Sequence, residues 1–168
     1  MTRIGKVDFY CGAFLSYLVT NRVEPILLDA TDKSKRIQFA LRDQDYSVYL
    51  KYVGTGKSSE KQGKTFYKWD AVFTAAEKGV LMTEYQDKKQ NNLLVIVCTT
   101  EDFKDTFFAV IPIEDALDCL GKDSINNHPR ISIRRQKGSS NVSIYGTALS
   151  DKNAKIIKYD CDTYFGFK

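Results

Sequence analysis

Two short runs of alternating apolar and polar residues, 37–41 and 48–52, constrain the fold more than any other feature of the sequence. A two-residue period is typical of strands with one buried face, whereas a helix repeats every ~3.6 residues. The runs are also rich in Val, Ile, Phe and Tyr, which favour strands. We therefore predict a β-hairpin that turns through residues 43–45, and we expect the rest of the chain to pack around it.

Further strand and helix patterns lie on both sides of this hairpin. Thr74 and Glu77 have the spacing of a capping box, in which each side chain bonds to the other's backbone amide, and they predict that a helix begins there. Before that helix, Tyr67, Trp69 and Phe73 share the alternating positions that we expect to face the core. In chain order, the predicted elements are a helix over 7–19, the hairpin strands, a strand over 65–73, a helix over 75–86, a strand over 93–98 that is buried on both faces, a strand over 106–113, a short helix over 114–120 and a hairpin of 131–135 with 142–145.

The size and composition of the chain fit one globular domain. With 168 residues, of which 43% are hydrophobic, the chain can bury one substantial core. We predict a single α+β domain over residues 1–168, with a mixed, mostly antiparallel sheet of six or seven strands, two main helices and a C-terminal hairpin. No stretch approaches the roughly 18 to 20 apolar residues that span a bilayer, so we expect no membrane partner.

The cysteines and the single histidine argue against a zinc site and against a thiol nucleophile. The four cysteines are widely spaced, and none forms a C-x-x-C pair. Cys98 lies in an apolar run and Cys119 in a helical pattern, so we expect buried free thiols and a reducing, cytoplasmic location. His128 lies in a loop pattern without a recognisable orienting residue or nucleophile, so we assign it no chemical role.

Basic residues gather in two segments, although the net charge is only +4. The first segment, 54–64, predicts a flexible, positively charged loop, and Tyr67 and Trp69 lie near it in sequence as rings for base stacking. The candidate nucleic-acid contacts are Lys57, Lys61, Lys64, Arg134, Arg135 and Lys137. Together the two segments favour a surface that binds phosphates, with an ordinary solvated loop and a charged hairpin as the alternative.

The motif DYSVYLKY places Lys51 late in a hairpin strand, within an order of helix, three strands, helix and strand. This order resembles the common core of the restriction-endonuclease-like nucleases, the PD-(D/E)XK superfamily, in which a motif lysine follows the second acid by two positions. The resemblance implies a metal-dependent nuclease, in which carboxylates bind a divalent cation such as Mg²⁺ and Lys51 positions the attacking water.

The acids of this chain depart from the family pattern. Tyr49 stands at the position of the second acid, and a phenol is a poor ligand for a hard cation. The nearest acids are Asp43 and Asp45, and at roughly 3.3 Å per residue Asp45 lies about 20 Å from Lys51 along the strand. The other candidate ligands are Asp8 and Asp29. The metal ligands of a nuclease site are therefore not assigned by the sequence.

The sequence leaves three functions open. The first is the binding of nucleic acid or of a protein partner by a divergent, non-catalytic nuclease-like core. The second is a metal-dependent nuclease that acts on DNA or RNA, with Lys51, Asp43 and Asp45 as catalytic residues and Mg²⁺ as cofactor. The third is a protein-interaction subunit, for instance a homodimer that associates through the aromatic tail at 164–167. Whether the chain is an enzyme is not decided by its sequence.

Overall fold

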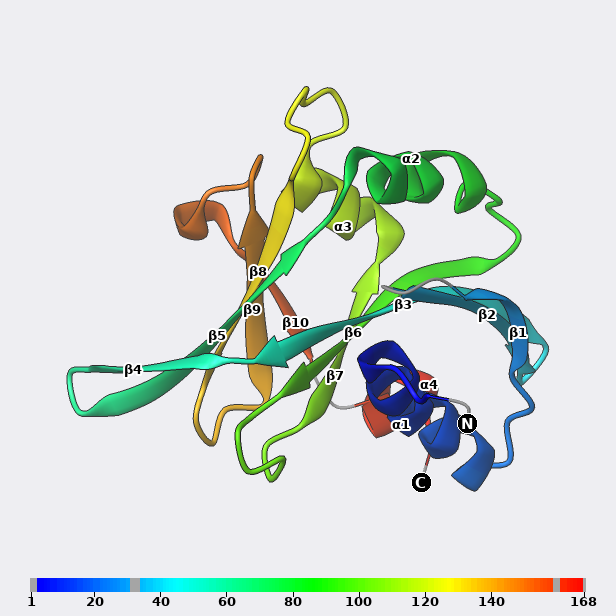
Figure 1. Cartoon of the computed structure of the whole chain (residues 1–168), viewed down its shortest axis with the longest axis horizontal. Coiled ribbons are helices and arrows are strands. Elements are labelled where there is room, and N and C mark those ends of the chain that lie inside the picture. Colours follow the sequence, from blue (N-terminus) through cyan, green and yellow to red (C-terminus); the bar gives the residue numbers. More distant parts are fainter. Residues whose placement is uncertain (1–2, 31–33, 159–160, 168) are drawn as a thin grey trace.

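The structure is a computed structural model that describes residues 3–30, 34–158 and 161–167. Within these residues, ten strands form two five-stranded sheets, and four α-helices pack on them (Figure 1). The predicted α+β class is confirmed. The prediction of one sheet with six or seven strands is wrong, because the chain leaves the first sheet after residue 55 and begins a second one.

Sheet A, the first of the two, contains the predicted hairpin. Its order is β1-β2-β3-β6-β7, in which β3 and β6 run parallel and the other neighbours antiparallel. The strands are β1 (Ile26–Ala30), β2 (Ser34–Leu41), β3 (Gln44–Thr55), β6 (Asn91–Thr99) and β7 (Phe107–Pro112). The hairpin turns through Arg42 and Asp43, whose φ angles of 52° and 61° are typical of a two-residue turn. The turn is therefore tighter than the sequence predicts.

Sheet B has the order β10-β9-β8-β5-β4 and is antiparallel throughout. Its strands are β4 (Lys57–Lys61), β5 (Lys64–Val72), β8 (Arg130–Gln136), β9 (Asn141–Gly146) and β10 (Lys155–Lys158). The prediction of a flexible loop over 54–64 is wrong, since β4 pairs with β5 along its whole length. Backbone pairing with β5 forms this strand, although its polar sequence has no strand pattern of its own.

Three of the four α-helices in the described residues appear where the sequence predicts them, and the fourth, α4 (Cys161–Phe165), was not predicted. The other three are α1 (Lys6–Thr20), α2 (Ala75–Glu84) and α3 (Ile113–Leu120), and a short 3-10 helix lies at Asp151–Asn153. The capping box at the start of α2 is confirmed. The Thr74 hydroxyl accepts from the Glu77 amide at 3.1 Å, and the Glu77 carboxylate accepts from the Thr74 amide at 2.8 Å.

Sheet A lies in the middle of the molecule, covered on both faces (Figure 1). On one face, Phe14 and Leu18 of α1 pack with Val48 and Leu50 of β3. On the other face, sheet B, α2 and α3 pack against the alternate residues of β3, β6 and β7. Residues 93–98 of β6 are all buried, so the prediction of a strand covered on both sides is confirmed. Sheet B, in contrast, contributes one face to this core.

The chain passes from sheet A to sheet B at Gly56. Its amide donates to the Thr99 carbonyl at 3.0 Å, and the Trp69 indole N–H donates to the same oxygen at 2.7 Å. A Cβ atom at position 56 would collide with the Trp69 ring. Glycine is therefore required here, because the backbone crosses directly against the indole that joins the two sheets.

All four cysteines lie among the described residues and are buried free thiols, as predicted. Burial raises the pKa of Cys11 to about 12 and that of Cys119 to about 11, so both thiols are protonated at neutral pH. In the described part of the chain, no helix is both long enough and apolar enough to cross a membrane.

The aromatic C-terminal segment belongs to the core. Phe165 and Phe167 are buried and pack with residues of α1 and of the β2-β3 hairpin. The apolar residues of the segment 154–168 predict that it docks on the domain, and one of them, Tyr159, lies outside the described residues. Two of the three rings that the sequence predicts as a dimer surface are thus buried within the chain, and the third, Tyr164, is 40% exposed.

Candidate nucleic-acid interface

Alternate side chains of strand β5 point to the inner and the outer face of sheet B. Trp69 and Ala71 point inward, and each is only 1% exposed. Phe66 and Lys68 alternate with them and lie on the outer face, where both are partly exposed. Strand β4 continues this outer face, and all of its residues are exposed. The outer face of sheet B is therefore accessible to a ligand.

Positive side chains line up across this outer face. Lys57 of β4 pairs with Lys68 of β5, and Lys68 pairs with Arg134 of β8. Lys61 and Lys64 pair near the turn of the β4-β5 hairpin. Directly opposed residues in an antiparallel sheet share a face, so these five cations form one surface, which we call the cationic face. It joins two basic segments that are far apart in the sequence.

Three of the five cations lack a carboxylate partner. Lys68 Nζ lies 3.2 Å from Asp70 Oδ2, and Arg134 Nη1 lies 2.8 Å from Asp151 Oδ2. Among the ion pairs of the described residues, none involves Lys57, Lys61 or Lys64. These three ammonium groups are therefore available to an external anion.

Asp70 marks the end of the cationic face nearest to α2. Burial alone would raise its pKa, but the Ser132 hydroxyl, at 2.5 Å, and Lys68 stabilise the carboxylate and bring the pKa below its usual value. Asp70 is therefore ionised at neutral pH and offsets part of the positive charge around Lys68. The uncompensated positive charge lies towards the β4-β5 hairpin.

A hollow of about 320 Å³ lies on the cationic face. Its lining residues are Ser59, Lys61, Gln62, Lys64, Phe66 and Arg134. The ring of Phe66 thus shares a concave site with three positive side chains. Such a site can accept an anion and a planar apolar group together.

The remaining predicted contacts are separated from this surface. Arg135 is only 9% exposed, its guanidinium lies 5.3 Å from the Phe107 ring centre, and its Nε donates to the Ser139 carbonyl at 3.2 Å. Lys137 follows β8 and lines a different hollow, of about 840 Å³, together with Asp102, other acids and Lys57, which lies at the border between this hollow and the cationic face. Neither Arg135 nor Lys137 belongs to the cationic face.

The two rings that the sequence offers for base stacking do not lie on the outer face of sheet B. Both lie on the inner face of sheet B, where Trp69 is buried in the core and Tyr67 is partly buried against it. The rings on the outer face are Phe66 and Tyr145. The alternation that places Trp69 in the core would have placed Phe66 outside. The position of Tyr145 beside the cations depends on the pairing of the predicted β8-β9 hairpin with β5, which the sequence does not indicate.

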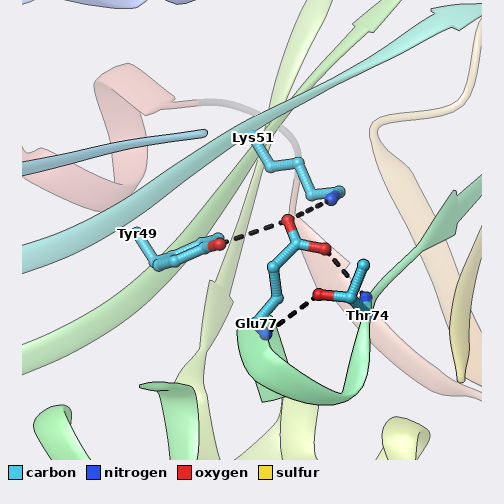
Figure 2. A network of polar contacts seen from close by, with 4 residues as sticks. All are labelled: Tyr49, Lys51, Thr74 and Glu77. Carbon is cyan, nitrogen blue, oxygen red and sulfur yellow. Dashed lines mark hydrogen bonds and ion pairs between the residues drawn. The ribbon is translucent and has the colours of Figure 1, made fainter. Parts of the chain in front are cut away.

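Lys51 lies in a buried polar network that joins β3 to α2 (Figure 2). Its Nζ lies 2.6 Å from Glu77 Oε1, and the Tyr49 hydroxyl donates to the same oxygen at 3.2 Å. The Lys51 side chain is 7% exposed and that of Glu77 is 12% exposed. Glu77 also holds the amide of Thr74, so this carboxylate ties the strand to the first turn of the helix.

The protonation states of this network follow from its contacts. Burial would raise the pKa of Glu77, but the hydrogen bonds from Lys51 and from the Thr74 amide outweigh it and lower the pKa. Burial raises the pKa of the Tyr49 phenol. At neutral pH the network therefore contains an ion pair and a neutral phenol, all engaged with one another.

The acids considered for a nuclease site do not converge on Lys51. Asp43 is in the hairpin turn and Asp45 is exposed near it, at the opposite end of β3. Asp8 binds Lys35 at 2.7 Å, on the face of sheet A that α1 covers. Lys51 lies on the other face, so the sheet itself separates it from Asp8.

The residues present do not fit the metal ion that the family resemblance implies. Among the described residues, no group of three or more His, Cys, Asp or Glu side chains is placed to hold a metal ion. A divalent cation that activates water needs several oxygen ligands in one place. The network around Lys51 supplies one carboxylate, and that carboxylate already has three hydrogen-bond donors.

Comparison of the chain with protein-family models, with curated proteins and with solved structures finds no match. The network around Lys51 is closed to solvent. The cationic face combines accessibility, unpaired positive charge and aromatic rings, and it is the candidate site.

Proposed function

We propose that the chain is a nucleic-acid-binding protein and that the cationic face of sheet B contacts the phosphates. The observation that carries the proposal is the strand register that aligns Lys57, Lys68 and Arg134 in one row. Lysine and arginine side chains that neutralise phosphates release the condensed counterions, and this release supplies most of the non-specific affinity. Lys61 and Lys64, which like Lys57 form no ion pair in the described residues, extend the row along the hairpin.

We further propose that the protein is a divergent, non-catalytic member of the nuclease-like group. The order of elements supports this: α1 precedes the antiparallel strands β1, β2 and β3, and α2 then leads to β6, which runs parallel to β3. The position of Tyr49 and the engagement of Glu77 support binding without hydrolysis. The four free thiols support a reducing, cytoplasmic location.

The experiment is a binding titration with fluorescein-labelled oligonucleotides, single-stranded and double-stranded, read by anisotropy across a salt series. The test variant replaces Lys57, Lys61 and Lys64 by Glu. We expect its affinity at low salt to fall at least tenfold. The slope of log affinity against log salt should decrease by about 2 to 3, because each lost phosphate contact contributes about 0.7 to 0.9.

The matched control replaces Lys88, Lys89 and Lys122 by Glu, which changes the net charge by the same amount. These lysines are exposed and lie outside sheet B. We expect the control to retain most of the wild-type affinity. Equal losses in the two triple variants, or no binding by the wild type at low salt, would overturn the proposal.

A further inference from the structure

Two aromatic rings lie on the outer face of sheet B beside the cations. Phe66 on β5 pairs with Gln136 of β8, and Tyr145 on β9 pairs with Ser132 of the same strand. Both rings are partly exposed. Within the described residues, neither ring packs against another aromatic ring. Neither ring is therefore covered by another described ring, and the contacts over the Tyr145 ring come from the cations Lys68 and Arg134.

Positive charges lie between and around these rings. Arg134 is two positions from both Ser132 and Gln136 along β8, so the pair Lys68 and Arg134 lies between the two rings. The Arg134 guanidinium carbon is 5.7 Å from the centre of the Tyr145 ring, and Lys68 Nζ is 5.9 Å from it. From the strand spacing and the rise per residue, the Cα atoms of Phe66 and Tyr145 are about 16 Å apart. Across the outer face, from β5 to β9, the order is therefore the Phe66 ring, the cations Lys68 and Arg134, and the Tyr145 ring.

We infer that the ligand of this face is single-stranded nucleic acid, two of whose bases stack on Phe66 and Tyr145 while the intervening phosphates pass Lys68 and Arg134. A single strand exposes base faces that can stack on aromatic side chains, whereas in a duplex these faces are covered by neighbouring bases. The hollow beside Phe66, with Lys61 and Lys64, would hold the first base and its phosphate. This inference rests on the proposed function and adds the form of the ligand and its binding mode.

The test compares a labelled twelve-nucleotide single strand with a duplex of the same length. We expect wild-type protein to bind the single strand at least tenfold more tightly. Phe66→Leu and Tyr145→Leu remove a ring without changing charge, and we expect each to weaken single-strand binding about 5- to 100-fold. Duplex affinity and the salt slope should stay at their wild-type values, since the cations are unchanged.

Phe66→Trp is the conservative counterpart, because it keeps a stacking ring. It should retain single-strand affinity, and its indole fluorescence should be quenched on binding. Trp69, the only native tryptophan, is buried and gives a constant background. Thermal unfolding of each variant checks the fold, and the Phe66 pair decides the question if Tyr145→Leu does not fold.

The two failures are distinguishable. If wild-type protein binds duplex as tightly as single strand, and the Leu variants bind both normally, the stacking inference is wrong and the cationic face alone explains binding. If wild-type protein binds neither oligonucleotide at low salt, the proposed function fails, and the inference fails with it. Binding that depends on the rings but leaves Phe66→Trp unquenched would also overturn the stacking geometry.

Discussion

Sheet A and sheet B have equal numbers of strands in the described residues but opposite relations to solvent. In sheet A, residues 93–98 of β6 are buried without a break, because helices cover one face and sheet B covers the other. In sheet B, every residue of β4 is exposed and β5 alternates between core and solvent. The centre of sheet A therefore has no open face for a ligand, whereas the outer face of sheet B is open.

The difference also separates the two lysine-containing sites. Lys51 of sheet A is buried and forms an ion pair with Glu77, so its charge stabilises the contact between β3 and α2. The lysines of β4 are exposed and form no ion pair within the described part of the chain. Under the proposed function, sheet A would serve as the scaffold, and the outer face of sheet B would carry the interaction with nucleic acid.

The largest expected effect comes from the contact between the sheets. Trp69→Ala removes the indole that lies on the inner face of β5, and we expect the free energy of unfolding to fall by about 3–5 kcal/mol. Phe66→Ala, on the outer face of the same strand, should cost less than about 1 kcal/mol. Urea denaturation of both variants measures the difference, and equal losses would mean that the outer face is also covered.

The second expected effect is in the network around Lys51. Glu77→Gln leaves the buried Lys51 ammonium without its counter-charge, so we expect a loss of about 3 kcal/mol in unfolding free energy. The control is Glu84→Gln on the same helix, whose pair with Arg36 is more exposed and should contribute less than about 1 kcal/mol. Similar losses in the two variants would show that the Lys51 site is open to water.

A smaller effect should appear in the pH dependence of stability. The pKa of Glu77 in the folded protein lies below its ordinary value of 4.5. Its contribution to stability is therefore complete above pH 4.5 and is lost as the pH falls through the lowered pKa. Wild-type stability should decrease more steeply than that of Glu77→Gln between about pH 4.5 and pH 3. If urea denaturation gives the two proteins the same dependence of unfolding free energy on pH, Glu77 is not the group whose protonation lowers the stability.

The smallest expected effect is on hydrolysis. We expect no difference in oligonucleotide cleavage between magnesium, manganese and chelator, because the acids of the described residues do not form a metal site near Lys51. The nuclease alternative predicts metal-dependent cleavage that Lys51→Ala abolishes. Gel analysis of labelled DNA and RNA decides between them, and cleavage lost in that variant would restore Lys51 as a catalytic residue.

The local structure was predictable because it depends on short-range patterns. Alternation identified the hairpin and the inner position of Trp69, and the spacing of Thr74 and Glu77 identified the start of α2. The division into two sheets was not predictable, since it depends on the pairing of β5 with β8 and on the polar strand β4. The cationic face follows from the same pairing, so Lys57 and Arg134 appeared in the sequence as separate patches.

The pairing of β5 with β8 also sets the order in which the protein can assemble during its synthesis. All five strands of sheet A precede β8 in the chain, as do β4 and β5. At about 5–20 residues per second, the roughly 60 residues between Val72 and Gln136 take about 3–12 s to translate. Throughout this interval β5 has an unpaired edge, and Arg134 has not yet joined the lysines of the hairpin. The scaffold can therefore form before its binding surface exists, and a nascent chain cannot present the complete cationic face until β8 has left the ribosome.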